Sequence, residues 1–293
     1  MIGNYLLRSV ISTDATGETI DAEHRDTGER VTIKALDISN TAVIKSVSNE
    51  IDVFERLGKD GSEYILKYID DIKEKYKGKN YRFIIMESLD ASPLTSFITA
   101  GNGNIPPPML WPIMLQLMLG LKYIHDRGFA HRSITSNNIY MTKNNRIKYT
   151  GFRTSCFDTF FGSTCKDTPD TTLTMYRPPE DFNTRKENSL SAEKAGDIWS
   201  LSMVFFELVH GNSRFPFVIT DSNGARLSEA KIIDNIIRTP PSQSVYKFSS
   251  KDGNRTNSFL NSMIVRDWTK RPKINDLIAI FMDKVLSYTY NPN

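Results

Sequence analysis

The sequence predicts an α+β protein of two lobes, in which a small antiparallel β-sheet with one helix precedes a larger, mainly helical part. Short β-like runs separated by turn residues fill the first third of the chain, and the apolar spacing becomes helical from about Ser92. The length of 293 residues and the apolar content of 39% are ordinary for a globular protein of this size. We therefore expect a first lobe at 1–87 and a second lobe at 88–293.

The first lobe is expected to contain five strands and one helix. Residues typical of strands occur in the runs Tyr5 to Ile11, Thr19 to His24, Val31 to Leu36, Tyr64 to Tyr68 and Tyr81 to Met86. The segment from Thr41 to Leu57 has helical spacing instead, so a single helix should pack on the sheet. Four lysines at positions 73, 75, 77 and 79 surround Gly78, which predicts a solvated hairpin tip.

Two long apolar helices are expected in the second lobe. The first begins at Pro106 to Pro108 and ends near Gly128, and the second runs from Asp197 to Gly211. Between them, residues 160–170 show no periodicity, which is typical of a long surface loop.

Composition disfavours several classes of partner. The net charge is +3 with basic residues spread along the chain, so we expect no nucleic-acid binding. No stretch approaches the ~18 uninterrupted apolar residues of a membrane helix, so we expect no membrane contact. The two cysteines, Cys156 and Cys165, are too few for a disulfide framework and predict reduced thiols in a cytoplasmic or nuclear protein.

Several ordered motifs carry a family resemblance. They are VTIK ending at Lys34, Glu50 in the following helix, HRSITSNNIYM from His131 to Met141, the triplet Gly151-Phe152-Arg153, YRPPE ending at Glu180, DIWSL from Asp197, and Arg271-Pro272. In this order and spacing they resemble the eukaryotic Ser/Thr protein kinases over about residues 4–285. The resemblance implies a bilobal protein-kinase-like fold.

The residues that would perform phosphoryl transfer depart from that family. The reaction needs a carboxylate base and metal ions on the phosphates. The resemblance implies that Ser133 stands where the family has its catalytic Asp, and that Gly151 stands where it has the metal-chelating Asp. Thr135 replaces the Lys of the catalytic loop, and Arg153 is the last residue of the altered triplet. A neutral hydroxyl cannot act as the base, at a loss of roughly 10²- to 10⁴-fold. We therefore expect no catalytic residue, no metal and no enzyme activity.

The nucleotide site is also expected to be degraded. Two glycine positions of the phosphate loop hold Ser12 and Asp14, and Asp14 would repel phosphate. Thr19, Thr32 and Tyr140 should narrow the adenine slot, although it is open whether Tyr140 fills the slot or points elsewhere. The vestigial nucleotide-binding residues are Gly17, Lys34, Glu50, Glu87, Leu89 and Asn138. We expect ATP to bind weakly or not at all, without magnesium.

The residues that hold the family's architecture are retained. Lys34 and Glu50 match the ion pair that joins sheet to helix, and Asp197 matches the acid that binds the catalytic-loop backbone. An apolar column of Phe54, His131 and Phe152 and a buried pair of Glu180 with Arg271 are also implied. Arg132 would grip a phosphorylated loop, with Thr171, Thr172 and Thr174 as candidate acceptors.

These residues favour a catalytically inactive pseudokinase that acts through protein–protein interaction. It would be an allosteric partner, decoy or scaffold for an active kinase or for that kinase's substrate. Two alternatives stay open. One is a metal-independent nucleotide sensor that uses Lys34 and the backbone around Glu87 to Leu89. The other is a weakly active or rewired Ser/Thr kinase, with Asp14 and Asp158 as the carboxylates placed near the cleft.

Overall fold

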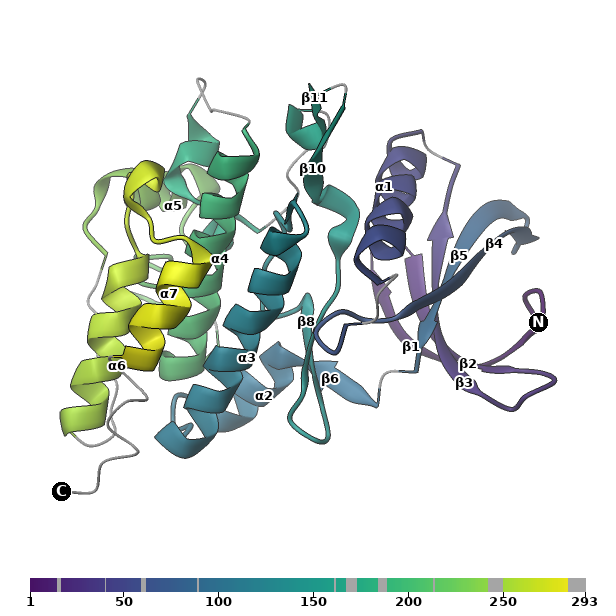
Figure 1. Ribbon diagram of the computed structural model, residues 1–293, viewed down its shortest axis with the longest axis horizontal. Coiled ribbons are helices and arrows are strands. Elements are labelled where there is room, and N and C mark those ends of the chain that lie inside the picture. Colours follow the sequence, from purple (N-terminus) through teal and green to yellow (C-terminus); the bar gives the residue numbers. More distant parts are fainter. Residues whose placement is uncertain are drawn as a thin grey trace.

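The computed structural model describes residues 1–14, 17–39, 41–58, 62–88, 90–160, 162–166, 173–183, 189–212, 214–241 and 250–283. In this part of the chain a sheet with helix α1 forms one lobe, and helices α2 to α7 lie in the other (Figure 1). The predicted α+β class, with an antiparallel first lobe and a helical second lobe, is confirmed.

The first lobe contains a five-stranded antiparallel sheet in the order β1-β2-β3-β5-β4. Its strands are β1 (Tyr5–Asp14), β2 (Gly17–His24), β3 (Arg30–Asp37), β4 (Tyr68–Tyr76) and β5 (Lys79–Glu87). Four strands lie where they were predicted. The fourth was predicted too early, because β4 is an exposed edge strand whose charged residues give little apolar alternation.

The β4–β5 hairpin turns at Lys77 and Gly78, as predicted. Lys73 and Lys75 lie within β4, however, and Lys77 Nζ pairs with Glu18 at 2.8 Å. The predicted helix is α1 (Thr41–Gly58), and it packs on the sheet through Val47, Ile51, Phe54 and Leu57.

The second lobe is built around two long helices, α3 (Pro107–Asp126) and α4 (Leu190–His210). The other helices are α2 (Leu94–Gly101), α5 (Glu229–Arg238), α6 (Ser250–Met263) and α7 (Ile274–Phe281). Helix α4 begins seven residues before the predicted start at Asp197, because the Ser189 side chain caps it by accepting from Ala192 N.

Short strands and 3-10 turns connect these helices. The strands are β6 (Ala91–Pro93), β7 (Phe129–Ala130), β8 (Ile139–Thr142), β9 (Ile147–Tyr149), β10 (Cys156–Thr159) and β11 (Gly162–Ser163). The turns are η1 (Phe152–Thr154), η2 (Thr164–Lys166), η3 (Thr174–Tyr176), η4 (Pro179–Phe182) and η5 (Trp268–Lys270).

Two predictions near β10 need correction. Residues 160–170 were expected to form an irregular surface loop, but 162–166 form β11 and η2, while 161 and 167–170 lie outside the described residues. Cys156 and Cys165 are joined by a disulfide with a Cα separation of 4.9 Å, so the prediction of free thiols is wrong. Counting cysteines could not show that a hairpin brings this pair together.

None of the helices in the described ranges is both long and apolar enough to cross a membrane.

The predicted buried ion pair of the second lobe is present. The Arg271 side chain is 0% exposed, and its two terminal nitrogens donate to Glu180 at 2.6 and 2.7 Å. Arg271 Nε also donates to Val265 O at 2.6 Å, and the guanidinium stacks 5.1 Å from the Trp199 ring. One side chain therefore joins η4, α4 and the segment before η5.

We predict that Arg271→Ala destabilises the protein, because it leaves Glu180 and a backbone carbonyl without their cation. Loss of one partner of a buried pair costs about 3–5 kcal/mol, so thermal unfolding should shift down by roughly 10 °C. The matched control is Arg238→Ala, since Arg238 pairs with Asp234 but is 79% exposed. Equal shifts of the two variants in thermal denaturation would contradict the assignment.

Candidate active site

The candidate site lies at the junction of the lobes, where α1 faces η1 and residues 131–138. Aromatic rings cross this junction. The Phe54 ring of α1 lies 5.2 Å from the Phe152 ring, which in turn lies 4.8 Å from the His131 ring. The predicted apolar column is therefore present, and it sets the distance between the lobes.

The ion pair predicted between Lys34 and Glu50 is formed. Lys34 Nζ lies 3.0 and 3.1 Å from the two carboxylate oxygens of Glu50. Glu50 is 1% exposed and Lys34 is 18% exposed, so the carboxylate is removed from water and requires this cation. The pair fixes α1 against β3.

Asn49, which the sequence reasoning missed, holds α1 to η1. Its side-chain amide donates to three backbone carbonyls, those of Phe152 at 3.4 Å, Arg153 at 3.1 Å and Ser155 at 2.9 Å. The sequence does contain a sign of this role, because asparagine is a poor helix former and Asn49 lies next to Glu50 in the middle of an amphipathic helix. Such a residue needs a tertiary partner to offset its low propensity.

Arg153 adds a second cation at Glu50. Its Nε lies 3.9 Å from Glu50 Oε2, and its side chain is partly buried. The predicted degenerate triplet therefore places a guanidinium beside the Lys34–Glu50 pair.

Asp197 organises the loop that begins at His131, as predicted. Its carboxylate accepts from the backbone N–H groups of His131 at 2.7 Å and Arg132 at 2.8 Å. Arg132 has a positive φ of 61°, a conformation that non-glycine residues adopt only when their surroundings hold them. The two hydrogen bonds to Asp197 provide that restraint.

The surroundings of the His131 imidazole favour its neutral form. It is fully buried, and burial lowers its pKa below the usual value. Nδ1 accepts from Ser133 N at 3.2 Å, so Nε2 carries the proton and donates to Thr150 O at 2.9 Å. Protonation would remove the acceptor that positions Ser133.

Three of the predicted degenerate positions, Ser133, Thr135 and Gly151, lie together around Asn138. The Asn138 amide donates to Ser133 Oγ and Ser133 O, both at 2.9 Å, and Thr135 Oγ1 accepts from Asn138 N at 3.2 Å. A Cβ added at Gly151 would lie 2.8 Å from Asn138 Cγ, and its φ of +81° also favours glycine. Neutral hydrogen bonds therefore occupy the place where the family has charged groups.

The residues around Asn138 lack the carboxylates of an ordinary magnesium site. Ser133 and Gly151 supply no carboxylate, which leaves Asn138 Oδ1 as the side-chain amide oxygen at this place. Within the described ranges no group of three or more His, Cys, Asp or Glu is arranged to hold a metal ion. The protein alone therefore does not form the carboxylate site that Mg²⁺ ordinarily uses.

Other predicted nucleotide residues have structural contacts. Glu87 Oε1 accepts from Lys67 N at 3.0 Å and from Lys148 Nζ at 2.5 Å, which joins the end of β5 to β9. A Cβ at Gly17 would lie 1.9 Å from Ala35 O, so the close approach of β2 to β3 requires glycine there.

The residues predicted to narrow an adenine slot lie on three strands. Thr19 is half-buried in β2, Thr32 is buried in β3, and Tyr140 is half-buried in β8. Leu89 and the side chains of Ser12 and Asp14 lie outside what the structure describes, and Asp158 is exposed on β10. That Thr19, Thr32 and Tyr140 narrow the slot, and that Tyr140 fills it, stay predictions.

Arg132, which was expected to bind a phosphorylated loop, is instead bonded to other groups of the protein. Arg132 Nε lies 3.0 Å from Glu193 Oε2, and Arg132 Nη1 donates to Thr154 O at 3.2 Å. Of the candidate acceptors, Thr174 is buried and its hydroxyl donates to Glu229, whereas Thr171 and Thr172 lie outside the described residues.

Comparison with known proteins agrees with this geometry. Residues 7–281 match the family described as protein kinase domain. A probable serine/threonine-protein kinase of Dictyostelium discoideum is 25% identical over 227 residues, which is 72% of this chain and 48% of that protein. Serine/threonine-protein kinase ATG1c of Arabidopsis thaliana is 26% identical over 246 residues (82% and 30%). Serine/threonine-protein kinase PAK mbt of Drosophila melanogaster is 23% identical over 269 residues (92% and 38%). The chain spans less than half the length of these relatives.

These comparisons correct two expectations. Protein kinases are enzymes that normally use ATP with magnesium, and the relatives are named serine/threonine-protein kinases. The expectation that the chain is not an enzyme is therefore wrong, as is the expectation that ATP binds weakly or not at all and without magnesium. With nearly its whole length matched, the chain belongs to the protein kinase domain family.

Proposed function

We propose that this chain is a Ser/Thr protein kinase domain that binds ATP and transfers its γ-phosphoryl group slowly. The observation that carries the proposal is the assembled Lys34–Glu50 ion pair, held at 3.0 Å at the junction of the lobes. In protein kinases this pair must be in place for the lysine to contact the nucleotide phosphates. Here Asn49 holds α1 in the position that the pair requires.

Two cations would face the phosphates. Lys34 and Arg153 both lie against Glu50, so one carboxylate positions both and leaves a net positive charge. Magnesium would neutralise charge on the phosphates. Because Ser133 and Gly151 supply no carboxylate, the ion would depend mainly on the nucleotide's phosphate oxygens and on water, with Asn138 Oδ1 as a protein ligand.

The proposed low rate follows from Ser133. Its hydroxyl cannot take the proton of an acceptor Ser or Thr at neutral pH, which removes roughly 10²- to 10⁴-fold in rate. Positioning and electrostatic stabilisation supply most of the remaining acceleration in phosphoryl transfer. The reaction is therefore slowed and not abolished.

A second role is proposed beside catalysis, namely binding a protein partner such as an active kinase or that kinase's substrate. The buried pairs that hold the lobes, Lys34 with Glu50 and Arg271 with Glu180, are complete, while the base position is neutral. A rigid two-lobed surface combined with slow phosphoryl transfer favours a role in which the domain acts by binding another protein. Affinity capture from cells with wild type and Arg271→Ala, which disturbs the fold, tests for a fold-dependent partner.

We predict that Lys34→Met weakens ATP binding in magnesium by roughly tenfold or more, because it removes the cation that contacts the phosphates. Isothermal titration calorimetry measures this directly. The control is Lys79→Met, which removes an exposed lysine paired with Asp37 on the same sheet and should leave the affinity unchanged. Equal affinities of the two variants, or no binding by the wild type, would overturn the proposed function.

We also predict that Ser133→Asp raises the autophosphorylation rate by roughly tenfold or more, because it restores a base. The carboxylate would accept the hydrogen bond that Asn138 now gives to Ser133 Oγ at 2.9 Å, so the loop geometry should persist. Ser133→Ala is the matched control, with a rate close to wild type. If Ser133→Ala abolished phosphate incorporation, the serine itself would be acting in the reaction and this account would fail.

A further inference from the structure

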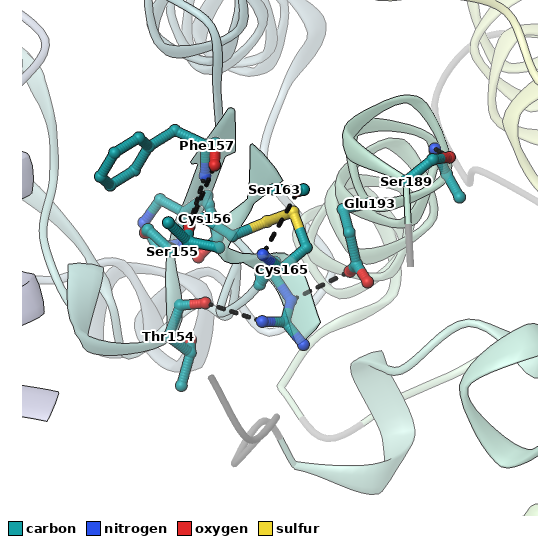
Figure 2. Close-up of a disulfide and its surroundings, with 12 residues drawn as sticks. Thr154, Ser155, Cys156, Phe157, Ser163, Cys165, Ser189 and Glu193 are labelled. Atoms are coloured by element: carbon teal, nitrogen blue, oxygen red, sulfur yellow. Dashed lines mark hydrogen bonds and ion pairs between the residues drawn. A yellow bond between two sulfur atoms is a disulfide. The ribbon is translucent and has the colours of Figure 1, made fainter. Parts of the chain in front are cut away.

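The Cys156–Cys165 disulfide lies directly beside the candidate active site. Strand β10 follows η1 after one residue, and it pairs with β7 so that Cys156 opposes Ala130, the residue before His131. Figure 2 shows Thr154, Ser155 and Glu193 around the bond. Strands β10 and β11 lie between α1 and α4 (Figure 1). The bond therefore stands where both lobes and the catalytic loop meet.

We propose that this disulfide is a reversible redox site whose reduction by a thiol releases the β10–β11 hairpin and loosens the active-site junction. Its effect on ATP rests on the proposed function, whereas the release of the hairpin does not.

The residues around the disulfide suit a bond that can be reduced in the folded protein better than a permanent structural disulfide. The bond joins residues only nine apart in sequence, so the loop that it closes is a single short hairpin. The two sulfurs sit in a small cluster with Ala130 and the flank of Leu190, separate from the main core. Reduced cysteines behave as small apolar residues, so both redox states are compatible with this cluster.

The described interactions within the hairpin are short-range. Its strands pair Asp158 with Ser163 and Thr159 with Gly162, and Thr159 Oγ1 donates to Gly162 O at 2.7 Å. The Thr164 hydroxyl accepts from Phe157 N at 3.0 Å and donates to Phe157 O at 3.1 Å. The disulfide is the covalent link between β10 and η2, so its loss should raise the frequency of local opening.

Opening would be transmitted because the residues before Cys156 hold both sides of the junction. Ser155 Oγ donates to His131 O at 2.9 Å, and Ser155 O accepts from Asn49 at 2.9 Å. Thr154 O accepts from Arg132 at 3.2 Å. Phe157 also lies 5.0 Å from the Phe129 ring and 4.6 Å from the Arg56 guanidinium of α1. A displacement of β10 therefore reaches α1 and the catalytic loop within two residues.

The chemistry is thiol–disulfide exchange. The thiolate of a dithiol reductant attacks Cys165 Sγ, the S–S bond breaks, and its electron pair passes to Cys156 Sγ, which takes up a proton. The second thiol of the reductant then displaces Cys165 Sγ, which is protonated in turn. The protein gains two thiols and the reductant becomes a disulfide. Because both cysteines are buried, attack requires opening of β11 and η2 at the outer edge of their sheet.

The test is to treat the folded chain with excess dithiothreitol under native conditions, to alkylate it with iodoacetamide, and to measure its intact mass by mass spectrometry. We expect two carbamidomethyl groups after reduction and none before. Hydrogen exchange followed by mass spectrometry should then show faster exchange over residues 155–165 in the reduced protein, with α7 unchanged. A bond that resists reduction until the protein is denatured, or exchange that is equal in both states, would overturn the proposal.

Two variants sharpen this test. The double variant Cys156→Ser, Cys165→Ser should exchange like the reduced protein and should not respond to dithiothreitol. The control Ser163→Ala alters the same hairpin but retains both cysteines, so its response should remain. A response of the double variant to reductant would show that the effect arises elsewhere and would contradict the proposal.

ATP titration separates this inference from the proposed function. We expect reduction to weaken ATP binding by roughly threefold or more, because the junction is less often assembled. If ATP binds neither state, the proposed function fails while the exchange data still decide the redox site. If ATP binds both states equally, the proposed link between the disulfide and the active site is wrong.

Discussion

The contact between α1 and η1 is the constraint on which the other parts of the site depend. Glu50 is buried and must be neutralised, so α1 stays where Lys34 can reach it. On the next residue of the helix, Asn49 satisfies three carbonyls of the segment that leads to β10. Phe152 O also accepts from Ser155 N at 3.1 Å, so loss of the Asn49 amide would mainly affect the carbonyls of Arg153 and Ser155, at a cost of about 1–3 kcal/mol for a buried acceptor left without its donor. This contact fixes η1 and the start of β10 against α1, while Asp197 holds the loop that begins at His131.

The charged groups of this domain divide into two kinds. Those in buried pairs, such as Arg271 with Glu180, are needed for folding, because breaking one pair is costly. Charged groups that act during phosphoryl transfer are a second kind, and the family resemblance assigns two of their positions to Ser133 and Gly151. The neutral network of Ser133, Thr135 and Asn138 keeps the loop ordered without those charges. An intact fold with slow chemistry is the expected combination.

The sequence predicted the parts of this domain that depend on local periodicity or on motif order. Helix α1, helix α3, the ion pair of Lys34 with Glu50 and the contacts of Asp197 all lie where expected. Strand β4 was displaced because an edge strand has a weak apolar pattern. Asn49 and the disulfide were missed because both depend on tertiary contacts that residue types alone do not reveal. The loss of chemistry was overestimated, since substituted side chains were taken to exclude activity in a chain that belongs to a kinase family.

The most direct measurement of the central claim is hydrogen exchange with mass spectrometry on Asn49→Asp. This substitution keeps the shape of the side chain but replaces the donating amide by an oxygen facing three carbonyl oxygens. The account predicts faster exchange over residues 131–138 and 152–156, with α7 unchanged, while Ser48→Ala on the exposed side of α1 resembles the wild type. Exchange that is unchanged in Asn49→Asp, or raised equally throughout the chain, would contradict the claim that this contact positions the site.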